Sequence, residues 1–160
     1  MDPSFVLARL PGERRMRFML TQMFTPHSQE NLSGYLAGEM DADGRARLTQ
    51  LTLPRSRMVL GPSQISRQIL ATPAVGDELR LLNEETSDLG DRSIDTVELS
   101  DPRIVPIGDS FLYVQPIYVT AQGNGVTRVR LVTVYLNGRV GWGRSLDAAL
   151  ARARRAPVKS

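Results

Sequence analysis

The chain of 160 residues has no cysteine, a single histidine, few aromatic residues and no long hydrophobic run. Without cysteine there are no disulfides, thiolate metal sites or cysteine nucleophiles. The apolar runs fall short of the roughly 18–20 residues that span a bilayer. Residues 1–10 lack the basic start and apolar core of a signal peptide. A net charge of +3 is too small to predict a nucleic-acid partner.

The apolar residues that are present are densest at residues 104–119, which read IVPIGDSFLYVQPIYV. Two runs rich in β-branched and aromatic residues flank Gly-Asp-Ser, and this arrangement predicts a hairpin. The second run does not alternate between polar and apolar residues, so we expect both of its faces to be covered.

The rest of the chain predicts short strands and short helices. Period-two patterns and turn signals predict strands at residues 5–10, 15–24, 48–53, 94–99, 126–136 and 140–142. Helical spacing and caps predict helices at residues 31–40, 63–70, 75–83 and 145–154, with a polar loop at 84–92.

These elements predict an α+β fold with a single domain over residues 1–155 and a frayed tail at 156–160. We expect one mixed, mostly antiparallel sheet built from hairpins, with about four short helices. The predicted core comprises Leu36, Leu51, Ile65, Leu79, Val105, Leu112, Val114, Val132 and Leu146.

Two acidic turns are candidates for a small-ligand, metal or enzymatic site. The first contains Asp41 and Asp43 and copies the first half of a calcium loop, but the position of the closing carboxylate is Gln50. The second contains Asp109 and Ser110, which a serine hydrolase would need to combine with a histidine, and only His27 is present. Plain turns are favoured at both, and we predict no catalytic, cofactor-binding or metal-binding residue.

Two charged segments and one tryptophan complete the candidates. An acidic segment could pair carboxylates for acid–base chemistry or bind a metal, but such runs are typical of solvated surface. A basic C-terminal end suits either a helix C-terminus or contact with anionic lipid. The single tryptophan suits a satellite core contact or an interface. These residues are Glu84, Glu85, Asp88 and Asp91; Arg152, Arg154, Arg155 and Lys159; and Trp142.

Several segments resemble, in order, the extracytoplasmic region of large bacterial membrane proteins of uncharacterised protein family 0182. They include FVLARLPGE at 5–13, LPRSRMVLGPSQISRQI at 53–69, ELRLLNEETS at 78–87, the hairpin at 104–119, and VRLVTVYLNGRV from residue 129. The chain departs from the family at Gln115, where an acidic residue is usual, and at residues 91–103, which replace an Arg-Gly-Asn block.

The resemblance implies a piece of a longer, multi-span protein of the bacterial cell membrane, facing the extracytoplasmic side. We therefore expect a non-catalytic interaction domain without a cofactor. Its partners would be the transmembrane region of its own longer chain or components of the cell envelope, with some contact to the membrane surface. An exposed apolar patch would support this interpretation.

Overall fold

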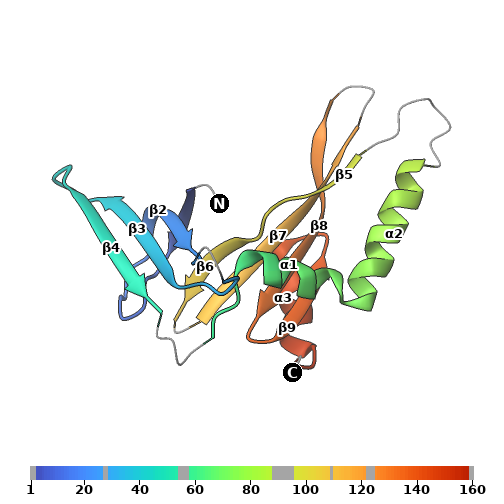
Figure 1. The fold of residues 1–160 in the computed structure, drawn as a ribbon. Helices are drawn as coiled ribbons and strands as arrows, with labels where there is room; N and C mark the ends of the chain where they lie inside the picture. Colours follow the sequence, from blue (N-terminus) through green and yellow to red (C-terminus); the bar gives the residue numbers. More distant parts are fainter. Residues whose placement is uncertain are drawn as a thin grey trace.

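The computed structural model describes residues 3–26, 29–53, 58–87, 96–108, 110–121 and 125–158. This part of the chain forms two antiparallel sheets, of four and five strands, and three helices (Figure 1). The predicted α+β class is confirmed, whereas the prediction of one mixed sheet and about four helices is wrong. Among the described helices, none combines the length and the hydropathy needed to cross a membrane.

Sheet A contains the first four strands in sequence order, each antiparallel to its neighbour. The strands predicted at residues 5–10 and 15–24 are confirmed as the antiparallel pair β1 and β2. The strands are β1 (Ser4–Ala8), β2 (Arg17–Phe24), β3 (Gly34–Met40) and β4 (Ala46–Thr52).

The helix predicted at residues 31–40 is wrong, because most of this segment is the central strand β3. Gly34 and Gly38 each disfavour a helix by about 1 kcal/mol relative to alanine. Pairing with β2 on one side and β4 on the other satisfies the backbone of the segment. As a strand, it buries Tyr35 and Ala37 on one face. Tertiary pairing therefore overrides the apolar spacing that suggested a helix.

Sheet B is organised around the predicted hairpin, which is confirmed as β6 (Arg103–Ile107) and β7 (Ser110–Thr120). The long strand β7 also pairs with β5 (Thr96–Leu99) and with β8 (Thr127–Leu136). The ladder ends at β9 (Arg139–Gly143). Positive φ angles of 49° at Asn137 and 77° at Gly138 form the tight turn that Asn-Gly predicts.

Helices cover both faces of sheet B. Ala149 and Ala153 of α3 (Leu146–Arg155) pack on Leu112, Val132 and Val134 on one face. On the other face, α1 (Pro62–Leu70) packs near Tyr113, and Leu82 of α2 (Pro73–Ser87) packs on Ile117 and Leu131. The hairpin is thus covered on both faces, as its sequence predicts.

Helix α2 extends beyond the predicted residues 75–83 and includes the start of the segment expected to be a loop. An ion pair one helical turn apart, between Arg80 and Glu84 at 2.6 Å, supports this extension. The predicted helix at 145–154 is confirmed, and the hydroxyl oxygen of Ser145 accepts a hydrogen bond from the Ala148 amide at 3.2 Å.

One hydrophobic cluster joins the inner face of sheet A to α1 and to the first half of sheet B. Met19 and Tyr35 belong to it together with Ile65, Ile104 and Tyr113. The predicted core is confirmed for Ile65, Leu112 and Val132, whereas Leu36, Leu51, Leu79, Val105 and Val114 are only partly buried.

Leu146 was predicted to be in the core, but it is 42% exposed. Helix α3 approaches β9 so closely that Cβ atoms built on Gly141 and Gly143 would lie within 3 Å of α3 atoms. The contact surface of the helix is therefore made of alanines, and Leu146 at its first turn points away from the core.

Candidate interaction surface

The outer face of sheet A stays exposed, and no described helix or strand covers it. Its side chains are those that alternate with the buried ones along each strand. Seven large apolar residues on this face are between 41% and 70% exposed: Phe5, Leu7, Phe18, Leu20, Phe24, Met40 and Leu48.

The strand register places these side chains side by side. Phe5 lies opposite Leu20, Leu20 lies opposite Gly38, and Gly38 lies opposite Leu48, so one apolar row crosses all four strands. The rings of Phe5 and Phe18 are parallel, with their centroids 5.2 Å apart. The exposed residues therefore form one continuous patch rather than scattered contacts.

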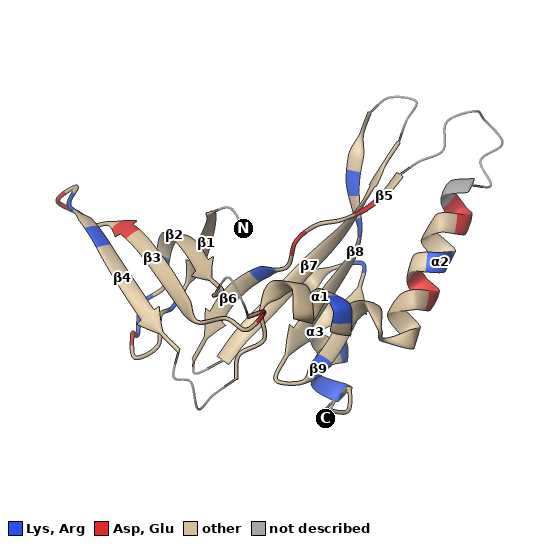
Figure 2. Ribbon diagram, in the orientation of Figure 1, with Lys and Arg blue, Asp and Glu red and all other residues tan. Residues whose placement is uncertain are grey.

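No charged side chain of the four strands lies on this outer face. Arg17, Glu39 and Arg47 alternate with the outer positions and point to the other face. There Arg17 forms ion pairs with Glu39 and, at 2.9 Å, with Glu13. In Figure 2 the charges on β3 and β4 lie near the turn between them, and the rest of both strands is uncharged.

A four-stranded face of about seven residues per strand covers roughly 400 Å² at ordinary strand spacing and rise. The largest apolar patch on a typical monomer is about 300–600 Å² and is often functional. The outer face of sheet A lies in this range, and within the described residues no strand residue on it is charged and no helix covers it.

The acidic turn at Asp41 and Asp43 joins β3 to β4. One carboxylate oxygen of Asp41 accepts hydrogen bonds from the amides of Asp43 at 3.0 Å and Arg45 at 2.8 Å. Gly44 has a φ of 76°, which supports the tight turn. These contacts give Asp41 a structural role, and no group of three or more potential metal-binding side chains occurs within the described ranges.

Ser110 lies at the start of β7, in the other sheet, while Asp109 and His27 are outside the described residues. The β3–β4 turn and the β6–β7 turn lie at separate places in the fold (Figure 1). The structure therefore does not bring Asp41 and Asp43 together with Ser110 in one pocket.

Ser110 does line a small pocket of about 140 Å³, together with Phe111, Tyr113 and Tyr135. The Tyr113 hydroxyl donates to the Leu60 carbonyl at 2.6 Å. Burial, and secondarily the nearby Tyr135, raise the pKa of Tyr113. Pockets for drug-sized ligands usually measure about 300–1,000 Å³, so this pocket suits packing better than ligand binding.

A second cleft of about 400 Å³ lies between β1 and β6 and is lined by residues 3–6 and 103–105. Arg103 is the only ionisable side chain among these residues. A lone guanidinium has no base, nucleophile or acid beside it, so this cleft offers no catalytic arrangement.

The remaining charged candidates form surface contacts. Glu85 pairs with Arg130 at 2.6 Å and Arg144 at 3.8 Å, whereas Asp88 and Asp91 lie outside the described ranges. The Arg152 guanidinium lies 4.5 Å from the centre of the Trp142 ring and donates to its carbonyl at 3.2 Å.

At the C-terminal end, Arg154 and Arg155 are exposed, and Lys159 is not among the described residues. Trp142 is half-buried and packs against two of the hydrophobic clusters, which agrees with the prediction of a satellite core contact.

Sequence reasoning did not find the outer face of sheet A. The runs FVL at residues 5–7 and FML at 18–20 carry apolar side chains on both faces of their strands. This pattern could have indicated that the outer face is apolar as well. Because β3 was predicted as a helix, the four strands were not assembled into one sheet.

Comparisons with known proteins give one family. The model of the uncharacterised protein family UPF0182 matches residues 1–82. A UPF0182 protein of Geobacter sulfurreducens is 32% identical over 162 residues, covering 99% of this chain and 17% of its own length. A UPF0182 protein of Trichlorobacter lovleyi is 30% identical and covers 95% of this chain and 16% of its own length. A UPF0182 protein of Clostridium acetobutylicum is also 30% identical and covers 93% of this chain and 16% of its own length.

The chain thus spans about a sixth of the length of these relatives. No solved structure matches it.

Proposed function

The chain belongs to the uncharacterised protein family UPF0182, and we propose that it is a non-catalytic interaction domain of a multi-span bacterial membrane protein. The outer face of sheet A carries this proposal. Seven exposed apolar side chains, with no charged strand residue on the same face, form a surface that water disfavours and that another apolar surface would cover.

The occupant that we propose for this face is the remainder of a longer polypeptide. A stable complex of free partners usually buries about 800 Å² on each, roughly twice the estimated area of the face. A covalent connection raises the effective concentration to about the millimolar range, so a smaller contact suffices within one chain. The length of the relatives, about six times that of this chain, supports this choice.

The extracytoplasmic side of the bacterial cell membrane is the location that we propose, with components of the cell envelope as further partners. The resemblance to the family supports this location. The exposed arginines at the end of α3 would suit a contact with anionic lipid headgroups. Sheet A and α3 would then serve different contacts, one apolar and one electrostatic.

An antibody against this domain tests the proposal in the source cells. We expect a band much larger than 17.7 kDa in the membrane fraction. Protease added to intact cells should shorten that band, because an extracytoplasmic domain is accessible from outside. A cytoplasmic marker protein, which must survive the same protease treatment, is the control.

A band of about 17.7 kDa in the soluble cytoplasmic fraction would refute the proposal. A large membrane-bound band that resists protease until the cells are opened would refute the extracytoplasmic location while leaving the interaction domain intact.

A further inference from the structure

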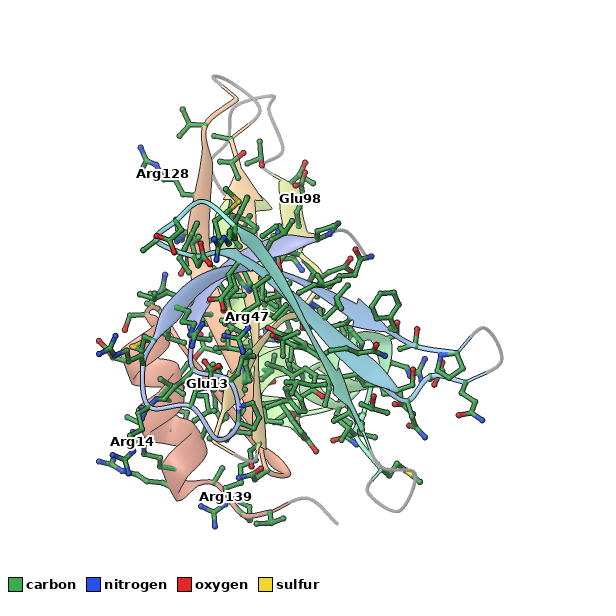
Figure 3. All side chains as sticks on the ribbon, turned by 90° about the vertical axis from the view of Figure 1, so that its left-hand side faces the viewer. Glu13, Arg14, Arg47, Glu98, Arg128 and Arg139 are labelled. Carbon is green, nitrogen blue, oxygen red and sulfur yellow. The ribbon has the colours of Figure 1, made fainter. Side chains whose placement is uncertain are left out.

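Strand β4 forms one lateral edge of sheet A. It pairs with β3 along its whole length, and no other described strand pairs with it. Figure 1 shows β4 as the outermost strand of the sheet, and Figure 3 shows it crossing the front of the molecule when the sheet A side faces the viewer. Within the described part of the chain, the backbone groups on its far side have no strand partner.

Proteins usually protect such an edge with a proline, a bulge, a short strand or a covering segment. Strand β4, with the sequence ARLTQLT, is seven residues long and contains no proline or glycine. Its register with β3 is continuous. Arg47, labelled in Figure 3, is the only charged residue in the strand and lies near one end. Charged side chains also protect edges, and Arg47 is the one that β4 carries, so the middle of the strand has none of these devices.

We propose that β4 pairs with β4 of a second copy of this chain, in an antiparallel arrangement across a twofold axis at Thr49. Thr49 is the midpoint of Ala46–Thr52, so this register gives the fullest overlap. It places Arg47 opposite Leu51 of the other copy, and no two like charges face each other directly. A parallel arrangement would instead set the two copies of Arg47 side by side.

Charge allows a second copy to pair with β4 in the antiparallel sense. The twofold axis separates the two arginines to opposite ends of the shared ladder. In this register, opposing residues such as Leu48 and Gln50 of the other copy lie an even number of positions apart in sequence. The outer faces of the two copies therefore lie on the same side of the combined sheet. The dimer would contain one eight-stranded sheet with an apolar face of roughly twice 400 Å², which approaches the area of a standard interface.

The mass of the 160-residue chain in solution tests this proposal. We expect sedimentation equilibrium at up to about 100 µM to show a dimer, with twice the monomer mass of 17.7 kDa. Thr49→Lys should abolish the dimer, because it sets two ammonium groups opposite each other. Thr49→Glu should do the same with two carboxylates.

An equimolar mixture of Thr49→Lys and Thr49→Glu should restore the dimer, since the two side chains then attract each other across the axis. Glu98→Lys, on the exposed strand β5, is the matched control and should leave the mass unchanged. Circular dichroism of each variant reports whether it folds. A monomeric wild-type chain, or a Thr49→Lys variant that folds and remains dimeric, would overturn the proposal.

Disulfide trapping provides a second readout, because the natural chain has no cysteine. Directly opposed residues of an antiparallel pair have Cα atoms about 4.5–5.5 Å apart, within the range of a disulfide. Thr49→Cys should form a covalent dimer on mild oxidation, several times faster than Glu98→Cys. Equal rates for the two variants would contradict β4 pairing. The result does not depend on the proposed function, because the edge and the outer face are different surfaces.

Discussion

Sheets A and B have strands of the same antiparallel kind but differ in what covers them. Both faces of sheet B lie under helices, and Ile117 and Val134 are completely buried there. Sheet A buries only its inner face, while Phe18 on its outer face is 65% exposed. The fold of this chain alone explains the apolar residues at the centre of sheet B, whereas it does not explain those on the outer face of sheet A.

The contact that we propose for the outer face would account for this difference. An exposed sheet face usually carries polar side chains at alternate positions, as antiparallel sheets with one solvated face do. On the outer face of sheet A, the row of Phe5, Leu20 and Leu48 carries apolar side chains where polar ones would be usual. The variants below test whether the two sheets differ as this interpretation requires, starting with the largest expected effect.

Gly141→Ala should destabilise the covered face of sheet B most strongly. The new Cβ would lie 2.0 Å from the Ala149 carbonyl oxygen and 2.6 Å from the Ala153 amide, so α3 would have to move. We expect a loss of at least about 3 kcal/mol in the free energy of unfolding, measured by urea denaturation. Gly76→Ala in α2, where nothing lies within 4 Å, is the control and should be stabilising or neutral.

Ile117→Ala and Phe18→Ser compare the two sheets directly. Ile117 is completely buried, so its truncation should cost about 2–4 kcal/mol in the free energy of unfolding. Phe18 is exposed and loses only its ring contact with Phe5, so its replacement should cost no more than about 1 kcal/mol. A large loss of stability for Phe18→Ser would show that the outer face is already packed within this chain.

High pH should weaken the contact between sheet B and the segment before α1. Burial raises the pKa of Tyr113 above its ordinary value of 10.0. The folded state therefore favours the neutral hydroxyl, and this contribution is present below pH 10 and lost as the pH rises toward the folded-state pKa. Urea denaturation from pH 8 to 11 should show a steeper loss for the natural chain than for Tyr113→Phe.

The smallest effect is expected for the exposed pair of Glu30 and Arg67, which links residues before β3 to α1. The hydrogen bond from Arg67 lowers the pKa of Glu30 below 4.5. The pair thus stabilises the fold above about pH 4.5, and this contribution disappears as the pH falls through the lowered pKa. Arg67→Met should shift the acid-unfolding midpoint slightly upward, and circular dichroism would detect the shift.

Local chemistry was sufficient to predict most elements of sheet B and the helix α3. Asn137-Gly138 defines a tight turn, Ser145 caps a helix, and the apolar run around Tyr113 indicates a strand that is covered on both faces. Each of these signals depends on neighbouring residues and on little else.

The rest depended on contacts between distant residues. Leu32, Tyr35 and Leu36 fit helical spacing, and only pairing with β2 and β4 makes that segment a strand. The position of Leu146 depended on how closely α3 approaches Gly141. The outer face of sheet A becomes apparent only when the four strands are placed in register, so the sequence alone did not identify it.

Cysteine labelling in the source cells tests the central claim, that the outer face of sheet A is covered in the native protein. Phe18→Cys reports on that face, and Asp77→Cys, on the exposed side of α2, is the reference. Both should react with a maleimide in the purified 160-residue chain. The same labelling is then carried out in cells, which are opened if the reagent does not reach the protein. We predict that the labelling rate of Phe18→Cys, divided by that of Asp77→Cys, is at least about tenfold lower there than in the purified chain. An unchanged ratio would show that the face is bare in the native protein and would contradict the account.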